Sequence, residues 1–264
     1  MATTEKKPAA SPSKRAKDRR EQQLQQQKRN QQLLLGILAV AFLIGVVAVL
    51  VITIQANQPQ ATIASDIKTR YAPFQAQNLQ GVTDAGFPYL GAANAPSTLE
   101  EFGSFSCPHC AEFHDSIFVN LLDEIQAGRV KVVFIPITNI GAFNAQPETE
   151  AAICVAQQGK FWEMNDVLFS WQGLYGTGAN DPARLSSAAK ELGLDVDKYN
   201  SCLSAGTGKQ VVEKAAEDAS KRNVNVTPTV FFNGQQISPD PKTQTSPTLS
   251  QYRGLIEAAA TKKS

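Results

Sequence analysis

The sequence has few of the residues that hold metal ions and haem, since its 264 residues include only four cysteines and two histidines. Covalent haem attachment needs a CxxCH motif, but the CPHC motif at residues 107–110 is followed by Ala111. Structural zinc commonly takes four ligands from two close pairs, whereas Cys154 and Cys202 are each isolated. A zinc site completed by His114 is therefore disfavoured, and we expect neither a metal nor another cofactor.

Charge is absent from residues 33–54, LLLGILAVAFLIGVVAVLVITI, which contain a single threonine. At about 1.5 Å per residue, this helix would be roughly 33 Å long, enough to cross the hydrocarbon core of a bilayer. A core helix of that length would normally show a polar face, and a signal peptide would have a shorter apolar run before a small-residue cleavage site. Neither feature is visible, so we predict one retained transmembrane helix in contact with lipid.

Positive charge is concentrated before this apolar run. Residues 1–32 carry nine Lys/Arg against three Asp/Glu, whereas the rest of the chain carries sixteen against twenty-one. Because basic flanks stay in the cytoplasm, we expect a cytoplasmic N-terminus and a body outside a bacterial cell membrane. The Gln- and Lys-rich composition of residues 1–32 predicts a disordered tail. Its charge is explained as a topology signal, so no nucleic-acid partner is expected.

The first half of the outer body reads as a linker followed by a strand, a helix and a strand. Residues 55–90 are rich in Gln, Asn, Ala and Pro with little apolar periodicity, which is typical of a linker. Residues 98–106 predict a strand that leads into the CPHC motif. Apolar residues recur every four positions from Phe113 to Ile125 and predict an amphipathic helix. Residues 130–138 predict a buried strand, so this region forms a βαβ unit.

The second half of the body is predicted to be mostly helical. Helical patterns fill about 147–222, where Asp181 is a candidate N-cap before Pro182. Asn233-Gly234 is a favoured two-residue turn between two short strands. A last helix is expected over about 249–260. The order is therefore βαβ, a helical insert, then ββα.

The CPHC motif lies where a strand ends and a helix begins. The amide groups and the partial positive charge of a helix N-terminus stabilise a thiolate, and a protonated His109 would add a full charge. Pro108 is tolerated in a first helical turn because its missing N–H would be unpaired there. Together these features should lower the pKa of Cys107 from about 8.5 into the range of roughly 3.5–7.5. A purely structural disulfide with Cys110 is disfavoured because so short a loop adds little stability.

Four segments resemble the DsbA family of thiol–disulfide oxidoreductases, within the thioredoxin superfamily. They are LEEFGSFSCPHCAEF (99–113), AAICVAQQGKFWEMNDVLF (151–169), YNSCLSAG (199–206) and VTPTVFFNG (226–234). The resemblance runs in family order over about 175 residues, and it is to the form with an extra cysteine pair. It implies an α/β thioredoxin fold over 91–264 with a helical insert at about 140–222.

The resemblance also implies roles for individual residues. Cys107 would be the exposed nucleophile and Cys110 the buried partner that resolves the mixed disulfide. Pro228 matches the cis-proline that lies against the CxxC motif, and the backbone of Thr227 could pair with an extended substrate. Glu101 matches an acidic position that relays a proton to or from Cys110, although a solvated strand carboxylate is the alternative.

The second cysteine pair falls on two predicted helices of the insert. The resemblance implies a structural disulfide between Cys154 and Cys202, with two free buried thiols or a second redox relay as alternatives. His114 is expected on the helix surface. Three aromatic residues are expected in the core of the insert, although a substrate groove could also use them: Phe161, Trp162 and Trp171.

The resemblance implies a membrane-anchored thiol oxidase that accepts electrons from the reduced cysteines of exported proteins. A separate membrane protein would reoxidise it. A disulfide isomerase or reductase on the same scaffold is one alternative, because threonine also precedes the cis-proline in family isomerases. Those isomerases typically carry a dimerisation domain, for which residues 55–90 are too short. A tethered binding or holdase module without turnover is the other alternative.

Overall fold

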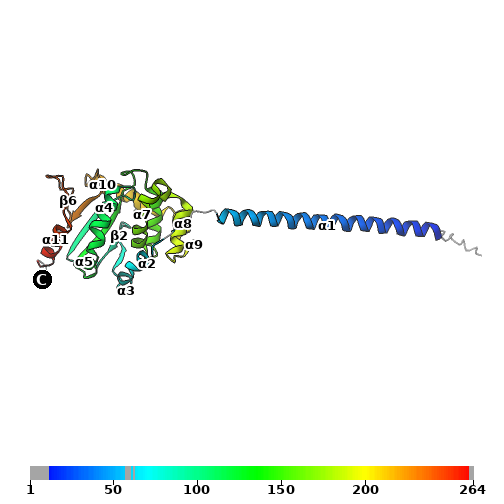
Figure 1. The fold of residues 1–264 in the computed structure, drawn as a ribbon, viewed down its shortest axis with the longest axis horizontal. Coiled ribbons are helices and arrows are strands. Elements are labelled where there is room, and N and C mark those ends of the chain that lie inside the picture. The colour runs from blue at the N-terminus through cyan, green and yellow to red at the C-terminus, as the bar shows by residue number, and fades with distance from the viewer. Residues whose placement is uncertain (1–11, 57–60, 62, 262–264) are drawn as a thin grey trace, which may run out of the picture. The chain divides into compact units, whose positions relative to one another are not determined.

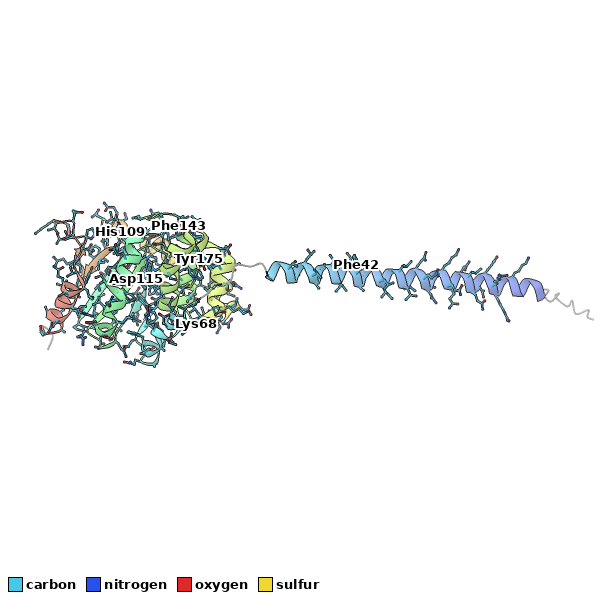
Figure 2. All side chains as sticks on the ribbon, in the orientation of Figure 1. Phe42, Lys68, His109, Asp115, Phe143 and Tyr175 are labelled. Atoms are coloured by element: carbon cyan, nitrogen blue, oxygen red, sulfur yellow. A yellow bond between two sulfur atoms is a disulfide. The ribbon has the colours of Figure 1, made fainter. Side chains whose placement is uncertain are left out.

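The computed structural model describes residues 12–56, 61 and 63–261, which divide into two compact units, Met1–Gln58 and Pro59–Ser264. The described part of the first unit is one helix, α1 (Pro12–Ala56) (Figure 1). By length and composition, its stretch Arg19–Val51 could cross a membrane. Side chains project from all sides of α1 in Figure 2, and Phe42 is 72% exposed. An apolar surface of this kind is suited to lipid.

The structure corrects the prediction of a disordered tail over residues 1–32. Residues 12–32 continue the apolar helix without a break, and residues 1–11 lie outside the described residues. The segment is rich in Gln, Arg and Lys, which have high helix propensity, and it lacks Gly and internal Pro. A segment with too few apolar residues to form a core of its own can therefore still extend a neighbouring helix.

The structure also corrects the linker predicted over residues 55–90. From residue 63 onward this segment belongs to the second unit and contains four short elements. They are α2 (Ser65–Arg70), α3 (Ala72–Ala76), β1 (Gln80–Val82) and β2 (Pro88–Leu90). Tyr71 and Leu90 are fully buried. Elements of three to six residues are too short to give a readable period, although their aromatic and aliphatic side chains still fill core positions.

A six-stranded sheet organises the second unit, in the order β1-β2-β4-β3-β5-β6. Its remaining strands are β3 (Ser97–Gly103), β4 (Val130–Pro136), β5 (Thr229–Phe232) and β6 (Gln235–Ser238). β3 pairs in parallel with β4 and antiparallel with β5, so the active-site strand is central. Asn233 and Gly234 have φ of 49° and 81°, as the predicted two-residue turn between β5 and β6 requires.

Helices cover the sheet, and most of them lie between β4 and β5 along the chain. The helix predicted after the CPHC motif is divided into α4 (Pro108–Ser116), a 3₁₀ turn (Phe118–Leu121) and α5 (Leu122–Gln126). The region between β4 and β5 contains α6 (Gln146–Ala156), α7 (Phe161–Tyr175), a 3₁₀ turn (Gly176–Asn180), α8 (Pro182–Glu191), α9 (Val196–Ser204) and α10 (Thr207–Lys221). Asp181 caps α8 by accepting from two backbone amides, as predicted. The chain's last helix is α11 (Leu249–Thr261).

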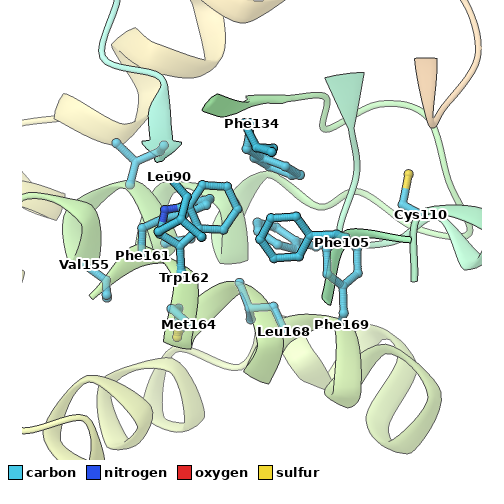
Figure 3. Close-up of a cluster of buried hydrophobic side chains, with 14 of the residues drawn as sticks. Leu90, Phe105, Cys110, Phe134, Val155, Phe161, Trp162, Met164, Leu168 and Phe169 are labelled. Carbon is cyan, nitrogen blue, oxygen red and sulfur yellow. The ribbon is translucent and has the colours of Figure 1, made fainter. Parts of the chain in front are cut away.

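The core lies between the sheet and α7. Figure 3 shows aromatic and aliphatic side chains of α7 facing Phe134 of β4 and Phe105, with Cys110 at the border of the cluster. Phe161, Trp162 and Trp171 are buried, with 3%, 2% and 1% exposure, so these three aromatic residues of α7 belong to the core. Burying side chains of this size is the main stabilising contribution to such a fold. The helical region is thereby fixed against the strand that leads to the CPHC motif.

Candidate active site

The two cysteines of the CPHC motif occupy the first turn of α4. Cys107 is the N-cap residue, with extended backbone angles, and Pro108 begins the helix. Both thiols are buried, but Cys107 retains 6% exposure whereas Cys110 has none. The Sγ atom of Cys110 accepts a hydrogen bond from the amide of Ser104 at 3.4 Å. An attacking sulfur can therefore reach Cys107 but not Cys110.

The environment of Cys107 stabilises its thiolate. A hydrogen bond from the Cys110 thiol lowers the pKa of Cys107 to about 5, and the backbone amides of Cys110 and His109 act in the same direction. Partial burial opposes this shift. The imidazole of His109 is 79% exposed and lies 3.4 Å from Glu112. The backbone amide of His109 therefore acts directly on the Cys107 thiolate, while its ring lies in solvent.

Cys110 is held in the opposite state. Burial raises the pKa of its thiol well above the ordinary value, and the hydrogen bond to Cys107 and the charge of Glu101 act in the same direction. Two neighbouring groups whose environments separate their pKa values take different roles in proton chemistry. The geometry thus makes Cys107 the group that ionises and Cys110 the group that holds a proton.

A cis-peptide loop lies against the first cysteine. The Thr227–Pro228 bond is cis, and the Sγ atom of Cys107 lies 3.2 Å from the carbonyl oxygen of Thr227, to which the protonated thiol donates a hydrogen bond. Thr227 is 8% exposed, and its hydroxyl has no hydrogen-bond partner among the described residues. The structure therefore brings together Cys107, Thr227 and Pro228, three residues that the sequence analysis placed in one site.

A groove adjoins this contact. It has a volume of about 420 Å³ and lies between α4, the loop around Pro228 and the segment 238–247. Its lining includes two apolar side chains, Ile117 at the C-terminal end of α4 and Val226, which is 45% exposed. His109 and Pro228 line the same groove. A peptide bound here would lie beside the exposed edge of Cys107.

Glu101 is a buried carboxyl group beneath the cysteines. It lies on β3, is 3% exposed, and its Oε1 atom has no hydrogen-bond partner among the described residues. Burial raises the pKa of Glu101 to about 8, the positive charge of His114 opposes that rise, and the charge of Cys107 adds to it. The charge of Glu101 in turn raises the pKa of Cys110. A carboxyl group that titrates near neutral pH can exchange a proton with a neighbouring thiol.

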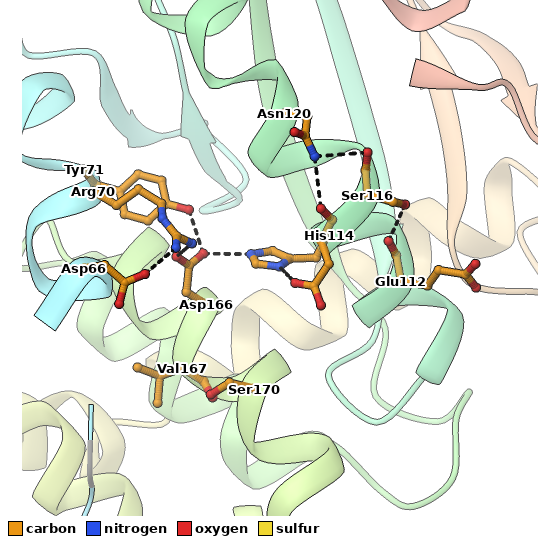
Figure 4. Close-up of polar contacts among 11 residues, drawn as sticks. Asp66, Arg70, Tyr71, Glu112, His114, Ser116, Asn120, Asp166, Val167 and Ser170 are labelled. Atoms are coloured by element: carbon orange, nitrogen blue, oxygen red, sulfur yellow. Dashed lines mark hydrogen bonds and ion pairs between the residues drawn. The ribbon is translucent and has the colours of Figure 1, made fainter. Parts of the chain in front are cut away.

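The structure corrects the placement of His114 on the helix surface. Its side chain is 5% exposed, and Figure 4 shows it between two carboxylates. Nε2 lies 2.7 Å from Oδ1 of Asp166, and Nδ1 lies 3.0 Å from Oδ1 of Asp115. Although burial lowers it, these contacts raise the pKa of His114 to about 9. The i+4 spacing from Cys110 was the available signal, since it places His114 on the same inward face of α4.

The other two cysteines form a disulfide between α6 and α9. Cys154 and Cys202 are joined across 48 residues, and both are buried. This bridge connects two helices of the insert and shares no residue with the groove. Across the part of the chain that the structure describes, no group of three or more His, Cys, Asp or Glu side chains has the arrangement of a metal site.

The fold and the CxxC site define the class of this protein, and comparison with known sequences agrees with it. The family model described as Thioredoxin matches residues 83–258, which is more than half of the chain. The protein therefore belongs to the thioredoxin family, and the predicted thioredoxin fold is confirmed.

Individual relatives extend this comparison. The chain is 29% identical over 168 residues to Disulfide bond formation protein D of Bacillus subtilis, covering 58% of this chain and 70% of that protein. It is 33% identical over 146 residues to Na(+)/H(+) antiporter NhaA 1 of Salinispora arenicola, covering 55% of this chain. The chain spans about a fifth of the length of that antiporter and of a second one from Salinispora tropica.

Solved structures give the same picture. The crystal structure of oxidised BdbD from Bacillus subtilis superposes with a TM-score of 0.54 and 25% identity, covering 69% of this chain and 98% of BdbD. MdbA, a thiol-disulfide oxidoreductase from Corynebacterium diphtheriae, superposes with a TM-score of 0.52 and 23% identity, covering 68% of this chain and 92% of MdbA. The second likeness concerns the fold alone.

Proposed function

We propose that this protein is a membrane-anchored, extracytoplasmic thiol–disulfide oxidoreductase that introduces disulfides into exported proteins. The observation that carries the proposal is the pair of opposed thiols: the pKa of Cys107 is lowered to about 5, while that of Cys110 is raised. A stabilised thiolate favours the reduced form of the protein, so its disulfide is a strong oxidant. The likeness to Disulfide bond formation protein D and to BdbD supports the same activity.

The proposed reaction begins with a disulfide between Cys107 and Cys110. A substrate thiolate attacks the Sγ atom of Cys107, a substrate–Cys107 disulfide forms, and Cys110 leaves and takes up a proton. A second substrate thiolate attacks the substrate sulfur of that mixed disulfide, and Cys107 leaves as a thiolate. The substrate has then lost two electrons and two protons. One proton resides on Cys110, and the other passes to solvent because Cys107 stays ionised.

The groove beside Cys107 is the proposed substrate site. An extended, unfolded segment could place a cysteine at the exposed edge of Cys107 while its neighbouring residues contact Ile117 and Val226. The groove is open and of mixed polarity, which suits substrates that share an extended backbone more than a particular sequence. Exported proteins with reduced cysteines are therefore the proposed substrates.

Turnover requires a second partner. After one cycle the dithiol must lose two electrons before it can oxidise another substrate. We propose a membrane protein that carries a disulfide as the reoxidising partner. Tethering through α1 would keep the thioredoxin domain at the membrane surface, with the basic residues before the apolar run on the cytoplasmic side.

Catalysis of substrate oxidation tests the proposal. Full-length protein in detergent, at a small fraction of the substrate concentration, is mixed with a reduced protein substrate and oxidised glutathione. We expect the substrate to gain disulfides over many turnovers with the native protein and at the uncatalysed rate with Cys107→Ser. Equal rates for the two proteins would refute the proposed function. Preferential reduction of substrate disulfides would support the reductase alternative instead.

A further inference from the structure

A buried charged cluster lies behind the two cysteines, and the reaction described above does not use it. His114 follows Cys110 by one turn of α4, and its Nε2 atom lies 2.7 Å from Oδ1 of Asp166 on α7. The same Oδ1 atom accepts from the hydroxyl of Tyr71 at 2.6 Å, and Oδ2 pairs with the guanidinium of Arg70 at 2.5 Å. Figure 4 shows these side chains converging on Asp166. The cluster thus joins α4, α7 and the segment around α2.

The geometry assigns a positive charge to His114. A carboxylate can only accept hydrogen bonds, and each ring nitrogen of His114 faces one: Asp166 at Nε2 and Asp115 at Nδ1. Both nitrogens must therefore carry a proton. The ring is otherwise enclosed by aromatic side chains, with centroids 5.0 Å from Phe169 and 5.5 Å from Phe118. A charge in such surroundings persists only because its partners are in place.

This charge acts on the carboxyl group beneath the cysteines. Glu101 is buried on β3, and His114 is the positive group that lowers its pKa against the effect of burial. The other charged or titratable groups around His114 are Asp115 on α4, Asp166 on α7, and Arg70 and Tyr71 beside α2. Around Glu101 they are Cys107, whose charge raises the pKa of Glu101, and Cys110 and Tyr252, whose pKa values are raised by the charge of Glu101.

We propose that His114 and Asp166 are positioning residues for proton transfer at Cys110. Asp166 keeps His114 on α4 positively charged, and this charge keeps Glu101 able to accept the Cys110 proton. The inference rests on the proposed function, because it concerns the step that closes the Cys107–Cys110 disulfide.

The step starts from a mixed disulfide between Cys107 and a bound thiol. The Cys110 thiol gives its proton to the Glu101 carboxylate, and the resulting thiolate attacks the Sγ atom of Cys107. The Cys107–Cys110 bond forms, the bond to the bound thiol breaks, and that group leaves as a thiolate. Without the charge of His114, Glu101 would keep its own proton to higher pH and could not accept another.

The experiment measures ring closure directly. Full-length protein in detergent is converted to its Cys107–glutathione mixed disulfide at acidic pH, where Cys110 stays protonated. The pH is then raised in a rapid mixer, and release of glutathione is followed over a range of final pH values. We expect His114→Gln to slow release about tenfold at neutral pH and to move its pH midpoint upward by about one unit. Asp115→Asn, on the exposed side of the ring, should give a smaller shift in the same direction.

Two controls separate a positioning role from a purely structural one. Lys68→Gln removes an ion pair of the same α2 with Glu191 of α8, away from His114, and should leave the profile unchanged. In a Glu101→Gln background, His114→Gln should add no further shift, because its target group no longer titrates. A variant that only loosened the fold would lower the unfolding temperature without moving the pH midpoint.

The outcomes are distinct. An upward shift in His114→Gln that disappears in the Glu101→Gln background establishes the inference. If His114→Gln does not fold, Asp115→Asn carries the test, since Asp115 is 80% exposed and its replacement leaves the core intact. An unchanged midpoint in every folded variant overturns the inference while leaving the oxidoreductase activity in place. Failure of native protein to form or close the mixed disulfide would instead refute the proposed function.

Discussion

The sulfur atom of Cys107 lies 3.2 Å from the carbonyl oxygen of Thr227, a residue 120 positions further along the chain. This contact joins the N-terminus of α4 to the loop that precedes β5, and Thr227 in turn lines the groove. In the proposed function, this pair of residues would hold the reactive thiol beside the bound substrate.

Replacing each active-site cysteine should block the reaction at a different step. Cys107→Ser removes the group that ionises, so thiol–disulfide exchange should fall to the uncatalysed rate. Cys110→Ser leaves Cys107 able to react but unable to close a ring, so mixed disulfides with substrate should accumulate. Electrophoresis without reductant, after alkylation of free thiols, measures both. Accumulation of mixed disulfides in Cys107→Ser would contradict the assignment.

The thiolate of Cys107 should persist into acid. Its pKa is lowered to about 5, so ultraviolet absorbance of the thiolate should titrate with a midpoint near pH 5 in the reduced protein. Because the folded value lies below the unfolded one, the thiolate stabilises the reduced fold above the ordinary thiol pKa, and this stabilisation is lost as the pH falls through about 5. Cys110→Ala removes the side-chain hydrogen bond to the thiolate and should raise the midpoint by about one unit or more. A midpoint near the ordinary thiol value would contradict the site as described.

Replacing Glu101 should raise the free energy of unfolding and slow the reaction at Cys110. Burial raises the pKa of Glu101 to about 8, above its unfolded value, so the folded protein loses stability as the pH rises between the two values. Glu101→Gln removes that loss and should stabilise the protein at pH 7 by an amount on the order of 3 kcal/mol. It should also slow ring closure at Cys110. Denaturant unfolding at several pH values measures the first effect, and an unchanged pH dependence would contradict it.

The groove should matter for protein substrates and not for glutathione. Val226→Glu places a charge in the groove, so it should raise the KM for an unfolded protein several-fold while leaving the reaction with glutathione unchanged. Val82→Glu is a matched control, because Val82 is 48% exposed against 45% for Val226 and lies on β1, outside the groove. Equal effects of the two substitutions would argue against the groove as the substrate site.

Removing the second disulfide should weaken the fold without removing the chemistry. The bridge closes a loop of 48 residues, so Cys154→Ser combined with Cys202→Ser should lower the free energy of unfolding by about 4 kcal/mol on chain-entropy grounds. Exchange at Cys107 should continue below the new unfolding temperature. Loss of exchange in the folded double variant would favour a redox relay between the two cysteine pairs.

The parts of the fold that follow regular patterns could be predicted from the sequence. The strand before Cys107, the buried strand from Val130, the cap at Asp181 and the turn at Asn233-Gly234 each depend on a few neighbouring residues. Local rules of period, capping and turn geometry are sufficient for such elements. The placement of Cys107 at a helix N-terminus was accessible for the same reason.

Features that depend on distant contacts could not be predicted in this way. The segment around Tyr71 was taken for a linker because its elements are short, and it enters the core only through partners such as Asp166. His114 was placed at the surface because its two carboxylate partners come from its own neighbour and from α7, 52 residues away.

The equilibrium between the Cys107–Cys110 pair and glutathione tests the central claim most directly. Full-length protein in detergent is equilibrated with reduced and oxidised glutathione in varying ratio, and the redox state of this pair is read by alkylation and mass spectrometry. A variant without Cys154 and Cys202 serves as a second sample, in which only Cys107 and Cys110 can change their redox state. The thiolate of Cys107 predicts that the reduced protein is favoured at neutral pH, as in an oxidant of other proteins. A disulfide that persists in excess reduced glutathione would contradict the account, and it would make this protein a donor of electrons to its substrates.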